Sequence, residues 1–185
     1  MIPNIIHFIF FNNDSFKLTN YLSVISAYKV HQPERIYFYY SDEQENNPYW
    51  SWLKEIPIIE LVKVSKPERV KETPLTFYQQ KTDYFKLVKM IEKGGIYLDL
   101  DILSLKSFQP LIEQLNQSGK SCSLAMENEN NPEKNYQNLK GSISNSVIFA
   151  EPESPYLKEW LEKLPNNILG KPWAYQAVCL PRDIL

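Results

Sequence analysis

The strongest constraint on the fold is a junction between a helix pattern and a strand pattern at Gly94 and Gly95. Before the glycines, apolar side chains recur at helical spacing, and after them an apolar run leads to the sequence Asp-Leu-Asp at 99–101. The glycines supply the stop of the helix, and a strand that turns back there would run antiparallel to it. The junction predicts one half of a βαβ unit and therefore an α/β fold.

Strand and helix patterns alternate along the rest of the chain, which also favours βαβ units. Strands are expected over residues 2–11, 35–40, 58–64, 96–105, 122–127 and 142–150. Helices are expected over residues 18–30, 48–53, 76–93 and 156–164, and residues 128–140 are expected to form a solvated loop. The clearest helical face, in residues 76–93, consists of Tyr84, Leu87, Val88 and Ile91. The positions with rough helical spacing in residues 18–30 are Leu18, Leu22, Ile25 and either Ala27 or Lys29.

The composition excludes several classes of protein. The 185 residues suit one domain, and 43% hydrophobic residues can form a sizeable core. A net charge of −2 gives no electrostatic attraction to nucleic acid or to an anionic membrane. Because the chain has only five glycines, neither a P-loop nor a dinucleotide-binding glycine motif can be written in it.

The amino terminus carries no basic leader, and no apolar run reaches the roughly 18 residues of a membrane span. We therefore expect a soluble cytoplasmic protein without a transmembrane segment. Its two cysteines, Cys122 and Cys179, are expected to be free thiols.

Asp99 and Asp101 indicate metal chemistry. Because side chains alternate along a strand, both carboxylates are expected on one face, opposite Leu98, Leu100 and Ile102. Such a pair repels itself unless a cation lies between the two acids, and Mg²⁺ and Mn²⁺ favour hard oxygen ligands and also bind phosphate. The alternative, two solvated acids at a strand end, is disfavoured by the apolar flanks and the preceding glycines.

Asp83 is a third carboxylate that the junction brings to the same place. Helix rise separates Asp83 from Gly94 by roughly 16 Å, and strand rise separates Asp101 from Gly95 by roughly 20 Å. If the two elements are antiparallel, all three acids finish at one end. Lys86 lies three residues after Asp83 on a neighbouring part of the helix surface. The alternative for Asp83 and Lys86 is an exposed ion pair.

Three segments carry a family resemblance: IPNIIHFIF at 2–10, KTDYFKLVKMIEKGGIYLDLDIL at 81–103 and SNSVIFAEPESPYLKEWLEKL at 144–164. Together they resemble glycosyltransferase family 32 and its relatives, the enzymes with a DXD-containing sugar-binding region. The resemblance implies a single-domain GT-A fold, which is a Rossmann-like, mixed and mostly parallel sheet flanked by helices. It also implies transfer of a hexose from a UDP- or GDP-sugar to a glycan or other hydroxyl acceptor, with Mn²⁺ or Mg²⁺ and usually with retention at the anomeric carbon.

By position, the resemblance implies two catalytic residues, Asp83 and Asp101. Asp101 matches the principal metal ligand, which acts through the diphosphate, and Asp99 matches its partner at metal-bound water or the ribose. Asp83 matches an aspartate that holds hydroxyl groups of the donor sugar. Lys86 stands where relatives commonly have arginine, so the positive charge is kept and the bidentate fork is lost.

The resemblance assigns five further residues to the donor site. Phe10 falls near a tryptophan that often stacks on the nucleobase, and Ile9 would contribute backbone to the base. Tyr97 would approach the nucleotide from the motif strand, and Thr82 is assigned to the donor as well. Asn145 falls where the family often has a polar residue beside the acceptor side.

The other histidines and tryptophans receive structural interpretations first. His7, inside an apolar strand, is expected to be structural, and His31 is expected to favour the negative end of a helix dipole. Trp50 and Trp52 are expected in the core or at its rim, with an acceptor-sugar platform as the alternative. Trp173 has the better claim to lining a cleft.

The chain departs from the family near its carboxyl end. Many relatives close over the diphosphate with a segment containing histidine and tryptophan, whereas no histidine follows His31 here. Either the lid is built differently, or residues 1–185 are one domain of a longer polypeptide, or activity is impaired. Two other functions stay open: a non-catalytic nucleotide-sugar-binding domain, and a haloacid-dehalogenase-like phosphatase. The phosphatase needs further aspartates after the motif, and only Asp183 follows it.

Overall fold

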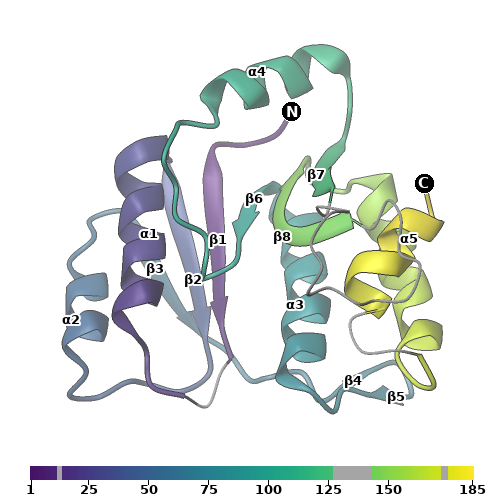
Figure 1. The fold of residues 1–185 in the computed structure, drawn as a ribbon, viewed down its shortest axis with the longest axis horizontal. Helices are drawn as coiled ribbons and strands as arrows, with labels where there is room; N and C mark the ends of the chain where they lie inside the picture. The colour runs from purple at the N-terminus through teal and green to yellow at the C-terminus, as the bar shows by residue number, and fades with distance from the viewer. Residues whose placement is uncertain (12–13, 127–142, 172–174) are drawn as a thin grey trace, which may run out of the picture.

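The computed structural model describes residues 1–11, 14–126, 143–171 and 175–185. Its centre is a six-stranded sheet (Figure 1) made of β1 (Ile5–Phe10), β2 (Arg35–Tyr40), β3 (Ile59–Lys63), β6 (Gly95–Leu98), β7 (Cys122–Met126) and β8 (Ile143–Ala150). The strand order is β3-β2-β1-β6-β8-β7. The strands β3, β2, β1 and β6 are parallel, and β8 runs antiparallel to both β6 and β7. A separate antiparallel pair joins β4 (Arg69–Val70) to β5 (Thr73–Pro74).

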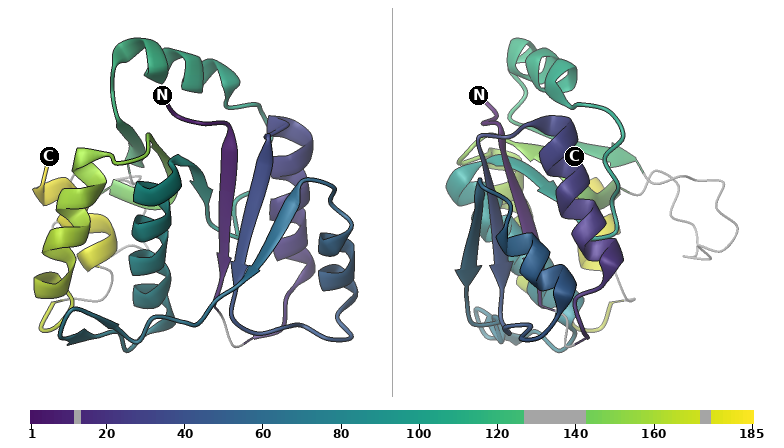
Figure 2. Two further views of the ribbon diagram at one scale, coloured as in Figure 1. Left: turned by 180° about the vertical axis from the view of Figure 1, so that it is seen from behind. Right: turned by 90° about the vertical axis from the view of Figure 1, so that its left-hand side faces the viewer.

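Helices cover both faces of the sheet, as Figure 2 shows from two further directions. One face packs against α1 (Leu18–His31) and α2 (Pro48–Lys54), and α4 (Gln109–Ser118) adds Ile112 to the same core. The other face packs against α3 (Tyr78–Lys93) and α5 (Pro155–Lys163). The last elements are η1 (Leu164–Asn167), the π-helical turn η2 (Tyr175–Cys179) and α6 (Leu180–Asp183). Each face of the sheet therefore packs against its own apolar core.

The mixed, mostly parallel α/β sheet is confirmed, but several strands are shorter than predicted, and the largest difference is in β6. The strand expected over 96–105 ends at Leu98. Leu100 and Ile102 continue the apolar alternation, yet they belong to a bend in which both pack, partly buried, against the core. The helix α4 was not predicted, because it buries only Ile112. The expected loop 128–140 lies outside the described residues.

The two glycines make the predicted turn between α3 and β6. Gly94 has φ +63° and Gly95 has φ +101°, the left-handed region that side chains with a Cβ rarely adopt. A Cβ on Gly95 would lie 2.6 Å from a side-chain carbon of Ile5 and 2.7 Å from its carbonyl oxygen. His7 is fully buried beside this turn, with Nε2 2.8 Å from the Gly94 carbonyl oxygen. The structural interpretation of His7 is thus confirmed.

The helix α1 is oriented differently from what its apolar spacing predicts. Leu18 and Leu22 are 42% and 41% exposed, whereas Ser23 and His31 are buried. Burial lowers the pKa of His31 to about 4, so its ring is neutral at physiological pH. His31 lies in the last turn of α1, as expected, but a neutral ring adds no positive charge at the helix end.

The tryptophans after β2 divide between the core and the surface. Trp50 is 1% exposed and packs edge-on against Phe16 and Phe38, which confirms its place in the core. Trp52 is 45% exposed and packs against Tyr21.

Both cysteines are free thiols, as expected. Within the described ranges, no helix combines the length and apolar character needed to cross a membrane.

Candidate active site

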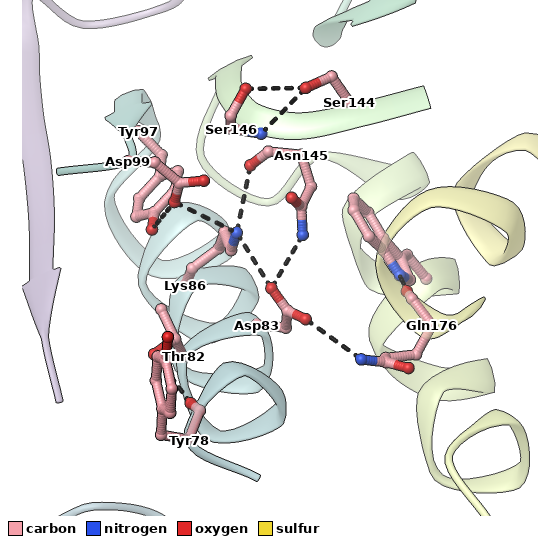
Figure 3. Close-up of polar contacts among 11 residues, drawn as sticks. Tyr78, Thr82, Asp83, Lys86, Tyr97, Asp99, Ser144, Asn145, Ser146 and Gln176 are labelled. Carbon is pink, nitrogen blue, oxygen red and sulfur yellow. Dashed lines mark hydrogen bonds and ion pairs between the residues drawn. The ribbon is translucent and has the colours of Figure 1, made fainter. Parts of the chain in front are cut away.

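The carboxyl end of β6, the first half of α3 and the start of β8 meet at one place (Figure 3). Because β8 is antiparallel to β6, its first residues lie beside the last residues of β6. The amide of Asp99 donates to the carbonyl oxygen of Ser146 at 2.9 Å, which joins the end of β6 to β8. The helix α3 runs back along β6 from the glycine turn, so its amino-terminal half reaches the same end. This is the antiparallel arrangement that the sequence predicts.

Asp83 and Lys86 form a buried ion pair on α3. Their closest atoms, Lys86 Nζ and Asp83 Oδ1, are 3.1 Å apart, and the two side chains are only 2% and 9% exposed for lysine and aspartate respectively. Lys86 Nζ also donates to the carbonyl oxygen of Asn145 at 3.1 Å. The alternative of an exposed surface pair is excluded by this burial.

The buried face of α3 is one residue out of phase with the predicted one. Its buried side chains are Asp83, Lys86, Leu87 and Met90, whereas the predicted Tyr84, Val88 and Ile91 are only partly buried. The difference arises because the helix buries a charged pair, which an apolar pattern does not reveal. Two buried charges on one helical face are costly unless they are paired, and here they are.

Two amides hold the carboxylate of Asp83 in addition to the lysine. Asn145 Nδ2 donates to Asp83 Oδ1 at 2.8 Å, and Gln176 Nε2 lies 3.4 Å from Asp83 Oδ2. Gln176 is 4% exposed, and its backbone carbonyl oxygen accepts from Trp160 Nε1 at 2.9 Å. Sequence reasoning missed Gln176, because a single glutamine outside any motif gives no signal. Gln176 lies in the π-helical turn η2, and π-helical turns are frequent at functional sites.

Lys86 also connects Asp83 to the D-x-D. Its Nζ is 4.0 Å from Asp99 Oδ1 and 4.4 Å from the centre of the Tyr97 ring. The hydroxyl of Tyr97 donates to Asp99 Oδ1 at 2.5 Å. Burial raises the pKa of Asp99, the Lys86 ammonium lowers it, and the negative charges of Asp83 and Asp101 raise it. In the described part of the chain, three carboxylates therefore lie close enough to interact electrostatically around one buried lysine.

The D-x-D lies in a turn and not on a strand face. The amide of Ile102 donates to the carbonyl oxygen of Asp99 at 3.2 Å, which closes the turn directly after β6. The expectation that strand alternation aligns Asp99 and Asp101 was therefore wrong. The turn, and not the strand, brings the charge of Asp101 close enough to act on Asp99. Asp101 is exposed, and the side chain of Asp99 is 32% exposed.

These residues fit a metal ion that is shared with a substrate. Across residues 1–11, 14–126, 143–171 and 175–185, no group of three or more His, Cys, Asp or Glu side chains is arranged to hold a metal. Asp99 and Asp101 offer hard oxygen atoms, and the negative charge of Asp101 raises the pKa of Asp99. Mg²⁺ is typically bound by one or two carboxylates together with substrate phosphates. The donor set suits that arrangement.

Three other residues predicted for the donor site, Ile9, Phe10 and Thr82, make contacts within the fold instead. Ile9 and Phe10 are 6% and 4% exposed, and the Phe10 ring packs edge-on against Phe16. The hydroxyl of Thr82 donates to the carbonyl oxygen of Tyr78 within its own helix. Their assigned contacts with a donor stay predictions. Trp173 lies outside the described residues.

The sequence pattern of the family described as "Glycosyltransferase sugar-binding region containing DXD motif" matches residues 22–118, more than half of the chain. The chain belongs to this family. The matched range includes Asp83, Lys86, Asp99 and Asp101. Asn145 and Gln176 lie beyond it and are brought to the site by the fold.

A curated relative of this chain is "Glucan organizing enzyme 1" of Cryptococcus neoformans var. grubii. The two are 30% identical over 161 residues, which is 87% of this chain and 41% of the relative. The chain thus spans less than half the length of that relative.

Comparison with solved structures identifies the fold of this chain. PaToxG glycosyltransferase matches with a TM-score of 0.67 at 17% identity, covering 100% of this chain and 69% of that protein. The galactosyltransferase LgtC, solved with donor and acceptor sugar analogues, matches with a TM-score of 0.56 at 17% identity, covering 98% and 66%. Both neighbours are GT-A glycosyltransferases, so the predicted GT-A fold is confirmed.

Proposed function

We propose that this chain transfers a hexose from a nucleoside-diphosphate sugar to a hydroxyl group of a glycan or another acceptor, with a divalent metal and with retention at the anomeric carbon. The observation that carries the proposal is the buried network of Asp83, Lys86 and Asp99 beside the exposed Asp101. A solvated acid pair would need no buried lysine and no converging amides. Family membership and the GT-A fold support the same function.

Asp101 and Asp99 would hold Mn²⁺ or Mg²⁺ in this proposal. The ion supplies charge neutralisation of the diphosphate, which makes the nucleoside diphosphate a better leaving group. Tyr97 orients Asp99 through its hydroxyl, and Lys86 limits the repulsion between Asp99 and Asp83. In this proposal the chain's own residues would determine where the donor's diphosphate is held.

Asp83 would bind the donor sugar. Its Oδ1 accepts from both Lys86 and Asn145, whereas among the described residues its Oδ2 has only a long contact with Gln176, at 3.4 Å. A carboxylate oxygen has capacity for more than one hydrogen bond, so Oδ2 can accept from sugar hydroxyl groups. Because Lys86, Asn145 and Gln176 fix the carboxylate from three sides, it would hold the sugar in one orientation.

We further propose that residues 1–185 act as one GT-A domain that contains the donor site.

The test of the proposed transfer is to incubate the chain with UDP- and GDP-hexoses and a mixture of acceptor sugars, with Mn²⁺, with Mg²⁺ and with EDTA. We expect metal-dependent release of the nucleoside diphosphate, by slow hydrolysis or by transfer. Metal-dependent binding without any release would instead identify a non-catalytic nucleotide-sugar-binding domain. Release of phosphate from monoesters would favour a phosphatase.

A further inference from the structure

The helix α1 buries two polar side chains, Ser23 and His31, beside the apolar Val24 and Ala27 that an amphipathic helix normally buries. Ser23 is 2% and His31 6% exposed, while Leu18 and Leu22 on the same helix face solvent. A sequence that breaks its own apolar pattern in this way is expected at functional positions, where another requirement outweighs core packing. The question is therefore what the buried polar face of α1 contacts.

This face contacts the chain that follows β6, from the D-x-D to the start of α4. Ser23 Oγ donates to the carbonyl oxygen of Asp99 at 3.3 Å, and the amide of Ser104 donates to Ser26 Oγ at 3.0 Å. The full set of contacts runs along the helix: Asn20 to Leu100, Ser23 to Asp99, Ser26 to Ser104, and His31 to both Ser104 and Phe108. We call residues 99–108 the D-x-D segment.

The ring of His31 has a defined role in these contacts. The amide of Phe108 donates to Nδ1 at 3.2 Å, so Nδ1 carries no proton. Nε2 therefore carries the hydrogen and donates to the hydroxyl oxygen of Ser104 at 2.8 Å. The ring also stacks on Phe108, with 4.1 Å between the ring centres. One neutral imidazole thus joins two points of the D-x-D segment to the end of α1.

We infer that Ser23, Ser26 and His31 are positioning residues that fix the D-x-D segment and thereby direct Asp99 and Asp101 towards the metal and diphosphate. The inference rests on the proposed function. On the sheet side, the turn is held by Ser146 through the Asp99 amide. On the opposite side, α1 holds the Asp99 carbonyl and the segment beyond. Because the carboxylates lie in a turn, the backbone contacts that fix this turn determine where they point.

The test uses the double variant Ser23→Ala/Ser26→Ala, and His31→Leu with His31→Gln as its conservative counterpart. Glutamine can still donate from Nε2 to the Ser104 hydroxyl, whereas leucine cannot. Thr19→Ala is the matched control, because Thr19 is an exposed hydroxyl residue on the same helix. Two quantities are measured for each protein: amide hydrogen exchange in the D-x-D segment, and affinity for UDP and GDP with and without Mn²⁺.

We expect faster exchange of the Ser104 and Phe108 amides and about tenfold or greater loss of Mn²⁺-dependent affinity, the usual effect of losing groups that orient metal ligands. Affinity without Mn²⁺ should stay unchanged, and His31→Gln should recover part of the loss seen in His31→Leu. Unchanged exchange would contradict the contacts themselves. Faster exchange with Mn²⁺-dependent affinity equal to that of Thr19→Ala would contradict the positioning role. Absence of Mn²⁺-dependent binding in the unaltered chain would contradict the proposed function, and faster exchange in the variants would then still support the contacts.

Discussion

Lys86 is the residue on which the charge balance of the site depends. It is almost fully buried between the carboxylates of Asp83 and Asp99, and it contacts both. Arginine would offer a planar fork at this position, whereas lysine offers a compact charge on a flexible stem. A hydrogen bond to the Asn145 carbonyl oxygen and a cation–π contact with the Tyr97 ring hold that charge in place. Lys86 is thus both part of the core and part of the site.

Removal of Lys86 is expected to destabilise the fold. Lys86→Met leaves two partly or fully buried carboxylates without their cation, and breaking a buried pair in this way costs about 3–5 kcal/mol. Lys163→Met is the control, because Lys163 and Glu159 form an exposed pair, and such pairs contribute about 0–1 kcal/mol. The measurement is urea unfolding of both variants. Equal stabilities would show that Lys86 does not compensate the site.

Asp83→Asn tests the sugar contact with little change in shape. It should leave the affinity for nucleoside diphosphate near that of the unaltered chain, because Asp83 is assigned to the sugar. Affinity for the nucleotide sugar should fall about ten- to a hundredfold, as expected for a charged hydrogen bond of about 1.5–3 kcal/mol. Paired calorimetric titrations with the diphosphate and its sugar conjugate measure both. If the two affinities fall together, Asp83 supports the site only indirectly.

At the level of elements, the junction of α3 and β6 brings the acids together. The glycine turn lets β6 lie against β1 with no Cβ between them. This part of the fold was predictable, because a helical period, two glycines and an apolar run are all local signals. The end of β6 was not, since the partly buried Leu100 and Ile102 imitate strand alternation inside a turn. The orientation of α1 and the contact of Gln176 with Asp83 were not predictable either, because both depend on tertiary hydrogen bonds.

Gly95→Ala is expected to weaken this junction. The added Cβ would meet backbone and side-chain atoms of Ile5 at 2.7 and 2.6 Å, so β6 would have to move away from β1. Gly119→Ala is the control, because Gly119 also has a positive φ but has nothing within 4 Å of an added Cβ. We expect Gly95→Ala to lower the free energy of unfolding by about 1–3 kcal/mol more than the control. Thermal and urea unfolding measure this difference, and equal losses would contradict the close packing.

For the whole molecule, the strand order explains why the site lies where it does. The chain proceeds from β1 outward to β2 and β3, and then returns to add β6 on the other side of β1. In open α/β sheets, ligands bind outside the carboxyl ends of strands at such a reversal. The D-x-D directly follows β6, one of the two strands at this point. The site therefore follows from the topology as well as from the motif.

The two buried histidines make the stability of the whole molecule depend on pH. Burial lowers the pKa of His7 and of His31 from 6.5 to about 4. Near His7, the positive charges of Lys93 and Lys89 lower its pKa, and Glu92 opposes them. The unfolded chain binds protons below pH 6.5 that the folded chain does not bind until about pH 4, so stability is present above pH 6.5 and falls between these values.

The shift of each histidine corresponds to on the order of 3 kcal/mol. Urea unfolding between pH 7 and pH 4 should show the loss, and His31→Gln should reduce its slope. A stability that does not change over this range would contradict neutral, buried histidines.

The central claim is that Asp99 and Asp101 bind a donor diphosphate through a divalent metal. The most direct measurement is calorimetric titration of UDP and GDP into the unaltered chain and into Asp101→Asn, with and without Mn²⁺. The account predicts that Mn²⁺ increases the affinity of the unaltered chain at least about tenfold, in line with shared metal–phosphate sites, and that Asp101→Asn abolishes this increase without unfolding. Equal, metal-independent affinities of the two proteins would contradict it.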